Sequence, residues 1–149
     1  MISPEELAKL NRTWWTQGYC CAPATFGMAV SPLGRPVPQT LRALNAFCGG
    51  MGTGATCGVL SGCLAALGCW LGKGGELESR DDRLKALSAA LYEEFEDHFG
   101  SLNCRDLAPA EHARRREVCP TFSLWAVERL WTLLQEGGID LSCRPDGRE

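Results

Sequence analysis

Residues 47–62 read FCGGMGTGATCGVLSG and join a glycine-rich segment to the start of an apolar one. Four glycines fall within positions 49–54, and glycine allows tight backbone turns because it has no Cβ and tolerates positive φ. Residues 57–71 show no polar face, which is typical of a helix that is buried on all sides. The sequence therefore predicts a tight loop that delivers Cys57 to the start of a buried central helix.

Helical patterns continue through the rest of the chain. A serine N-cap followed by a glutamate at the third helical position, Ser3 and Glu6, predicts a first helix that ends at Gly18. Further helices are expected at residues 23–30, from 38 onward, at 78–99, at 111–118 and from 119 onward. No segment shows the alternation of a strand. The predicted fold is all-α, a compact bundle of five to seven helices in one domain, residues 1–149, with 137–149 a loosely held tail.

The composition is typical of a soluble globular protein, with 45% hydrophobic and 22% charged residues. A formal net charge of −3 provides no basic surface, which argues against a nucleic-acid partner. The only basic run, residues 114–116, is expected to be a solvated helix face. The N-terminus lacks the pattern of a signal peptide, and the longest apolar run is too short to span a membrane. We therefore expect a cytoplasmic protein, in which thiols stay reduced.

Nine cysteines in a chain of 149 residues need an explanation. An odd number cannot all pair within the chain, and a reducing compartment favours metal or redox chemistry over disulfides. Free cysteine also serves as a small buried hydrophobe, and we expect this of four or five of the nine. The remaining cysteines are candidates for a functional site.

Three cysteines are predicted at helix N-termini. Cys21 precedes the second helix, Cys57 begins the buried helix, and Cys119 stands directly before Pro120. Free N–H groups and the helix dipole favour negative charge there, which should lower the thiol pKa and improve thiolate ligands. Cys104 follows a helix end and is free to point inward. Since thiolates hold iron–sulfur clusters, which carry negative charge, these residues favour a cluster site.

Four segments resemble the redox-active C_GCAxxG_C_C family, in the order in which that family has them. They are residues 18–22, 47–62, 100–107 and 119–122. The central motif appears here as CGVLSG, residues 57–62, with Val59 in place of alanine. The resemblance covers about residues 18–134, and the family is also similar to part of split-Soret cytochrome c.

The resemblance implies a redox role with an iron–sulfur cluster, either four-iron four-sulfur or two-iron two-sulfur. The family's four characteristic cysteines map onto Cys21, Cys57, Cys104 and Cys119. Haem is not implied, because the chain has no Cys-x-x-Cys-His. The other five cysteines depart from the family pattern, and their roles stay open: Cys20, Cys48, Cys63, Cys69 and Cys143.

Two other uses of the thiols remain open. A structural zinc site also takes four thiolates, but zinc ligands usually come in Cys-x2–4-Cys pairs, whereas the four here lie 36, 47 and 15 residues apart. Metal-free thiol–disulfide chemistry lacks its Cys-x-x-Cys motif, although Cys20 with Cys21, or a long-range pair, could serve. We expect an electron carrier or redox accessory protein rather than an enzyme, with a redox partner protein. Five tryptophans in so small a core also suggest a homodimer.

Overall fold

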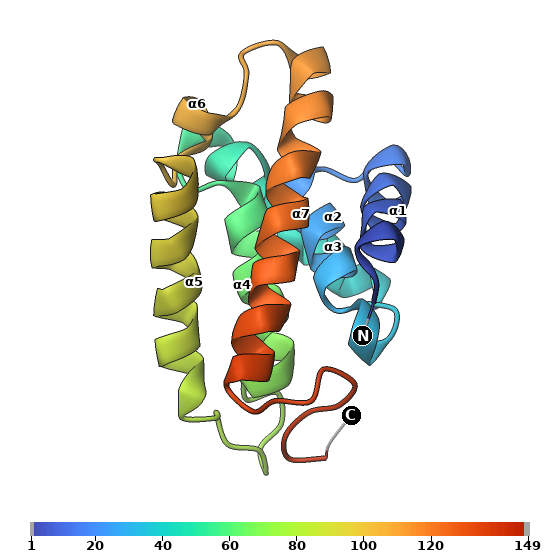
Figure 1. Cartoon of the computed structure of the whole chain (residues 1–149), viewed down its shortest axis with the longest axis vertical. Helices are drawn as coiled ribbons and strands as arrows, with labels where there is room; N and C mark the ends of the chain where they lie inside the picture. Colours follow the sequence, from blue (N-terminus) through green and yellow to red (C-terminus); the bar gives the residue numbers. More distant parts are fainter. Residues whose placement is uncertain (1, 148–149) are drawn as a thin grey trace.

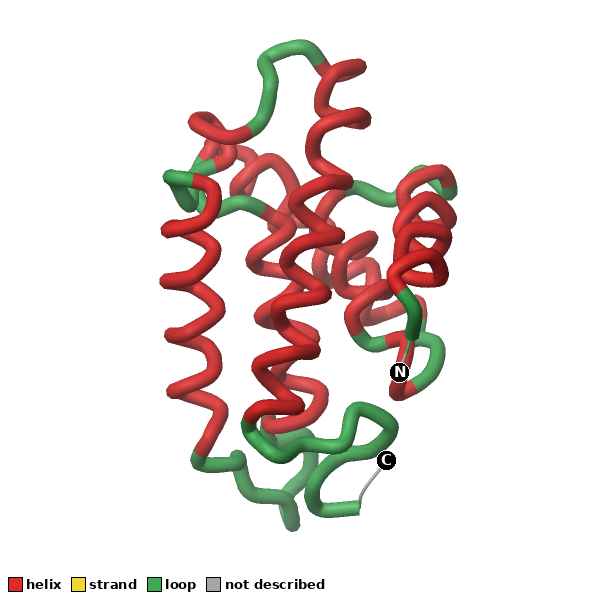
Figure 2. The backbone as a smooth tube through the Cα atoms, in the orientation of Figure 1, coloured by secondary structure: helices red, strands yellow, loops and turns green. Residues whose placement is uncertain are grey.

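The computed structural model describes residues 2–147, which fold as a helical bundle (Figure 1). Its helices are α1 (Pro4–Thr16), α2 (Cys21–Ala29), α3 (Pro38–Leu44), α4 (Gly58–Leu71), α5 (Arg83–Phe99), α6 (Cys104–Leu107) and α7 (His112–Glu136). Single 3-10 turns occur at Ser31–Leu33 and Asn45–Phe47, and a tight turn at Gly50–Gly54. The described residues contain no strand, as the trace in Figure 2 shows. The predicted all-α class is confirmed.

Helix α4 lies at the centre of the bundle, with α2, α5 and α7 packed around it (Figure 1). Nine of its 14 residues are buried, as its apolar sequence predicts. The contact with α2 is especially close at Gly62, where a Cβ would overlap the carbonyl oxygen of Ala22. Glycine at this position therefore sets the distance between α2 and α4, and with it the position of the residues at the start of α2.

Helix α1 begins as predicted. The Ser3 hydroxyl accepts a hydrogen bond from the Glu6 N–H (3.2 Å), and the Glu6 carboxylate accepts one from the Ser3 N–H (2.8 Å), which completes a capping box. The helix ends at Thr16, and Gly18 has a positive φ of 86°. This turn leads the chain from α1 into the first residues of α2.

Helix α7 is one helix of 25 residues, where the sequence predicts a break near residue 119. Proline lacks an N–H and usually ends a helix, which is why the break is expected at Pro120. Here the helix continues through Pro120, and the Pro120 carbonyl accepts a hydrogen bond from the Asn11 side chain of α1 (3.0 Å). Packing of the apolar half of α7 against α2, α4 and α5 offsets the lost backbone bond. Cys119 consequently lies inside a helix, and the prediction that it stands at an N-terminus is wrong.

Residues 137–147 make contacts that the sequence does not predict. Ile139 is buried, and the Trp70 indole N–H donates to the Leu141 carbonyl (3.2 Å). Arg144 donates to the carbonyls of Cys69 (2.9 Å) and Gly72 (3.0 Å) at the end of α4. The single domain of residues 1–149 and its loosely held tail stay predictions. Met1 and residues 148–149 lie outside the described residues. Across the described chain, no helix combines the length and apolarity needed to cross a bilayer.

Candidate functional site

A cavity of about 430 Å³ lies between the start of α2, the segment after α3, helix α6 and the first half of α7. Five cysteines line it: Cys20, Cys21, Cys48, Cys104 and Cys119. Aromatic and cationic side chains complete its wall, among them Trp15, Tyr19, His112, Arg115 and Arg116. Three of the four cysteines predicted as ligands therefore share one cavity. The fourth, Cys57, does not line it.

Cys21 is the first residue of α2, two positions earlier than the sequence places the start of that helix. Its sulfur lies against Gly58, the first residue of α4, and occupies the space that a Cβ on Gly58 would need. Burial raises the pKa of the Cys21 thiol, and a hydrogen bond from the Gly49 backbone opposes this. The glycine of the family's central motif thus makes room for a cysteine from another helix.

The glycine-rich segment turns the chain sharply before α4. Gly50, Met51 and Gly52 have φ angles of 63°, 56° and 70°, in the left-handed region that favours glycine. A Cβ at Gly50 would overlap the backbone of Ala55, whose N–H donates to the Gly50 carbonyl (3.0 Å). Met51 holds a backbone conformation that is uncommon for a residue with a side chain. The turn folds back on itself and fixes the point at which residues 55–57 leave it.

A short antiparallel contact joins residues 55–57 to residues 102–104. The Cys57 N–H donates to the Leu102 carbonyl (2.7 Å), and the Cys104 N–H donates to the Ala55 carbonyl (2.7 Å). Cys57 caps α4, Cys104 begins α6, and both are buried. Backbone pairing therefore holds together two cysteines that lie 47 residues apart in the sequence.

Cys119 reaches the site from the middle of α7. It is half-buried, and its pKa is raised to about 11, chiefly by burial and further by the neighbouring Cys21 and Cys104 thiols, while Arg115 lowers it. Arg115 itself donates from Nε to the Pro109 carbonyl (2.6 Å). Cys119 therefore lies close enough to Cys21 and Cys104 for their charges to affect its pKa.

The thiols of this site are harder to ionise than the sequence predicts. Burial raises the pKa of Cys57 to about 12, although the N–H groups of Val59 and Leu60 at the start of α4 lower it. Cys21 and Cys104 raise it further. The helix N-terminus therefore acts on Cys57 as expected, but desolvation is the larger effect. The expectation of lowered thiol pKa values is wrong for Cys21, Cys57 and Cys119.

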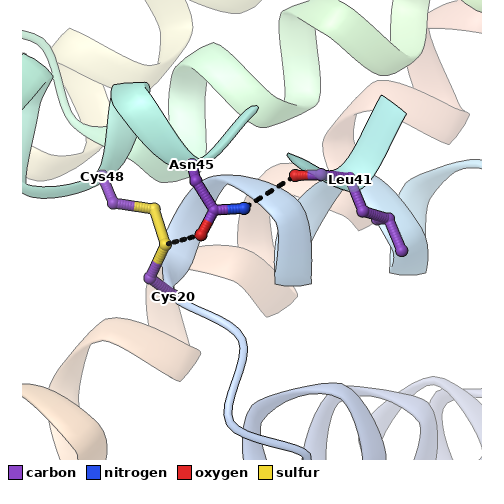
Figure 3. Close-up of a disulfide and its surroundings, with 4 residues drawn as sticks. All are labelled: Cys20, Leu41, Asn45 and Cys48. Carbon is purple, nitrogen blue, oxygen red and sulfur yellow. Dashed lines mark hydrogen bonds between the residues drawn. A yellow bond between two sulfur atoms is a disulfide. The ribbon is translucent and has the colours of Figure 1, made fainter. Parts of the chain in front are cut away.

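Cys20 and Cys48 form a disulfide in the cavity wall (Figure 3). Cys20 is the N-cap of α2, and Cys48 follows the 3-10 turn after α3, so the packing of α3 against α2 brings them together. The Asn45 side chain lies beside this bond, with Oδ1 3.7 Å from the Cys20 sulfur. The expectation that all thiols stay reduced is wrong for this pair, which the sequence offered only as an unspecified long-range pairing.

The remaining cysteines lie away from the cavity. Cys63 is fully buried in α4, where its thiol donates to the Ala126 carbonyl (3.3 Å), so it serves as a small core residue. Cys69 is half-buried near the end of α4, and Cys143 is exposed. Within residues 2–147, no group of three or more His, Cys, Asp or Glu side chains has the arrangement of a metal-ion site.

The arginines of the cavity wall come from α7, which continues as a single helix through Pro120. His112, Arg115, Arg116 and Cys119 are spaced i, i+3, i+4 and i+7, which places them on one helical face. The solvated helix face expected at residues 114–116 is confirmed for Arg114 and Arg116, which are exposed, whereas Arg115 is half-buried. The spacing of these four residues could be read from the sequence. The helix break expected before Cys119 separated Cys119 from the arginines, so their common face was not predicted.

Residues 19–133 match the family described as "Putative redox-active protein (C_GCAxxG_C_C)". The chain belongs to this family. The matched segment includes all four cysteines mapped from the C_GCAxxG_C_C motif and covers most of the cavity wall. No curated protein and no solved structure matches the chain. The resemblance to split-Soret cytochrome c and the ligand roles of the C_GCAxxG_C_C cysteines stay predictions.

Proposed function

We propose that this C_GCAxxG_C_C protein is an iron–sulfur redox protein. Thiolates of Cys21, Cys57, Cys104 and Cys119 would hold the cluster, of the four-iron four-sulfur or two-iron two-sulfur type. The observation that supports this is the gathering of Cys21, Cys104 and Cys119 around one cavity, with Cys57 tied to Cys104 by backbone pairing. Such a cluster, when bound, supplies one-electron transfer.

The four cysteine thiols are chemically suited to hold an iron–sulfur cluster. Thiolates are the usual ligands of iron–sulfur clusters, and the set needs nearby positive charge to offset its own. Arg115 supplies such charge close to Cys119, and the backbone N–H groups at the start of α4 face Cys57. Because ligand thiols must lose their protons, the raised pKa values mean that binding would release protons. The residues themselves would hold, orient and partly shield the bound group.

We favour a cluster over a single zinc ion, because zinc ligands usually come in Cys-x2–4-Cys pairs, which the four candidate cysteines lack. Four thiolates around one zinc ion at about 2.3 Å lie roughly 3.8 Å from one another. A cluster places several iron and sulfide atoms between its thiolates, so its ligands lie farther apart. The cytoplasmic location, the redox partner protein and the homodimer expected from the sequence remain predictions beside this proposal.

The test is anaerobic purification followed by iron and acid-labile sulfide analysis, a visible spectrum and EPR. We expect iron and sulfide in the wild-type protein and their loss in Cys21→Ser, Cys57→Ser, Cys104→Ser and Cys119→Ser. Cys143→Ser is the matched control, because Cys143 is exposed and away from the cavity. Circular dichroism of each variant separates loss of the cluster from loss of the fold.

Three results would count against the proposal. Stoichiometric zinc without sulfide would identify a structural zinc site. A metal-free protein that cannot be reconstituted with iron and sulfide would favour thiol–disulfide chemistry alone. Full iron content in all four serine variants would show that the ligand set is wrong.

A further inference from the structure

The disulfide Cys20–Cys48 lies in the wall of the cavity but outside the proposed ligand set. Both cysteines are half-buried, so the bond faces the cavity and is within reach of solvent. Disulfides that stay accessible are the labile and catalytic ones, whereas structural disulfides resist reduction. Its position therefore calls for a chemical explanation as well as a structural one.

We propose that Cys20 and Cys48 form a catalytic dithiol–disulfide pair, and that its substrates are small disulfides bearing carboxylate groups. The cavity volume of about 430 Å³ is in the range of small-molecule sites. The exchange belongs to the cluster-free protein, because a cluster held by Cys21, Cys104 and Cys119 would occupy the same cavity. Among the described residues, no hydrogen bond or ion pair holds the Arg116 side chain, which is exposed and lines this cavity. A guanidinium without a partner in the chain is available to a carboxylate of a ligand.

The reaction balances as two thiol–disulfide exchanges. The thiolate of one reduced cysteine attacks a sulfur of the substrate disulfide, forms a mixed disulfide and expels one substrate thiolate. The second cysteine then gives up its proton and attacks the first cysteine's sulfur, which closes Cys20–Cys48 and expels the second substrate thiolate. The two protons of the cysteine thiols end on the two product thiols. An external dithiol restores the reduced pair by the same exchange in reverse and becomes a disulfide.

The surroundings of the two sulfurs differ and assign their roles. The Asn45 amide is held by a hydrogen bond from Nδ2 to the Leu41 carbonyl (2.9 Å), which turns Oδ1 towards Cys20 (Figure 3). An amide oxygen only accepts hydrogen bonds, so in the reduced protein it can hold the Cys20 thiol as a hydrogen-bond donor. Among the described residues, no side chain makes a corresponding contact with the Cys48 sulfur, apart from its bond to Cys20. Cys48 is therefore the attacking residue, and Cys20 resolves the mixed disulfide.

The test uses the full chain, reduced and freed of excess dithiol, with glutathione disulfide as the probe. We expect Cys20→Ser to accumulate a glutathione adduct on Cys48, identified by mass spectrometry. We expect Cys48→Ser to form an adduct on Cys20 at a rate about tenfold lower or less. Cys143→Ser, the control, should turn over glutathione disulfide at the wild-type rate. An adduct that forms equally fast on either single variant would overturn the assigned roles.

The dependence of the reaction rate on the charge of the substrate provides a second test. Arg116→Gln should slow the reaction with glutathione disulfide about threefold, and leave the rate with cystamine, a cationic disulfide, unchanged or higher. Equal rates for the two probes in the wild-type protein would reject the substrate class. A Cys20–Cys48 bond that stays oxidised in excess dithiothreitol until the protein unfolds would show a purely structural disulfide.

This inference and the proposed iron–sulfur function can fail independently. Cys20→Ser and Cys48→Ser should retain the iron and sulfide of the wild-type protein, because neither residue belongs to the proposed ligand set. Loss of iron in Cys20→Ser would make Cys20 a ligand and reject the catalytic pair. Turnover of glutathione disulfide by a protein that never binds iron would reject the cluster and retain the pair.

Discussion

The two ends of helix α4 lie in contrasting surroundings. At its C-terminal end, the Trp70 indole and the Arg144 guanidinium donate to backbone carbonyls, and Arg144 also pairs with Glu78 (3.0 Å). At its N-terminal end, thiols and arginine side chains surround a cavity, and the exposed Arg116 side chain makes no hydrogen bond or ion pair among the described residues. The first end uses its polar groups to fasten the chain. The N-terminal end leaves thiols and the Arg116 side chain available to a bound group, which is why we place the functional site there.

The largest effect is expected from Gly58→Ala at the N-terminal end. The new Cβ would overlap the Cys21 sulfur and push this residue away from the other candidate ligands. Iron content after anaerobic reconstitution should fall about tenfold, in the range expected when a ligand's supporting contacts are disturbed. Gly68→Ala, in the same helix, is the matched control, because a Cβ there meets nothing within 4 Å. Unchanged iron content in Gly58→Ala would show that the Cys21 position is not critical.

At the opposite end, Arg144→Leu should lower stability and spare the site. It removes hydrogen bonds to two carbonyls and leaves the half-buried Glu78 without its ion-pair partner. Urea unfolding should show a loss of about 2 kcal/mol, typical of losing charged hydrogen bonds. Iron and sulfide content should match the wild-type protein. A matching loss of iron would mean that the two ends of α4 are coupled.

A smaller, pH-dependent effect on stability is expected from Cys57, at the N-terminal end of α4, in the reduced, metal-free protein. The folded state raises the pKa of Cys57 from about 9 to about 12, so above pH 9 the unfolded chain binds fewer protons than the folded one. Stability should therefore be complete below pH 9 and fall as the pH rises towards 12. Each such thiol contributes at most about 1.4 kcal/mol per pH unit.

Urea unfolding between pH 8 and 10.5 measures this dependence. The slope against pH should be shallower in Cys57→Ala than in the wild-type protein. Cys143→Ser should reproduce the wild-type slope, because Cys143 is exposed. Parallel curves for Cys57→Ala and wild type would show that the Cys57 thiol ionises as easily in the folded state as in the unfolded chain.

Sequence patterns were most reliable where neighbouring residues act on one another. The capping box of Ser3 and Glu6, the burial of α4 and the turn at Gly18 were all predicted, because each depends on residues a few positions apart. The family was likewise recognisable from short segments in order. The break at Pro120 was predicted by the same local reasoning, and it was wrong because the helix packs on four neighbouring helices that a local pattern does not contain.

By itself, the sequence determined the helical class, the buried central helix and the membership in a redox-active family. Only the tertiary structure decided that residues 55–57 pair with 102–104, that Cys20 bonds to Cys48, and that burial outweighs the helix dipole at Cys57. The reason is physical. Helix formation depends on contacts three or four residues apart, whereas the pairing and desolvation of sulfurs depend on segments brought together only when the bundle closes.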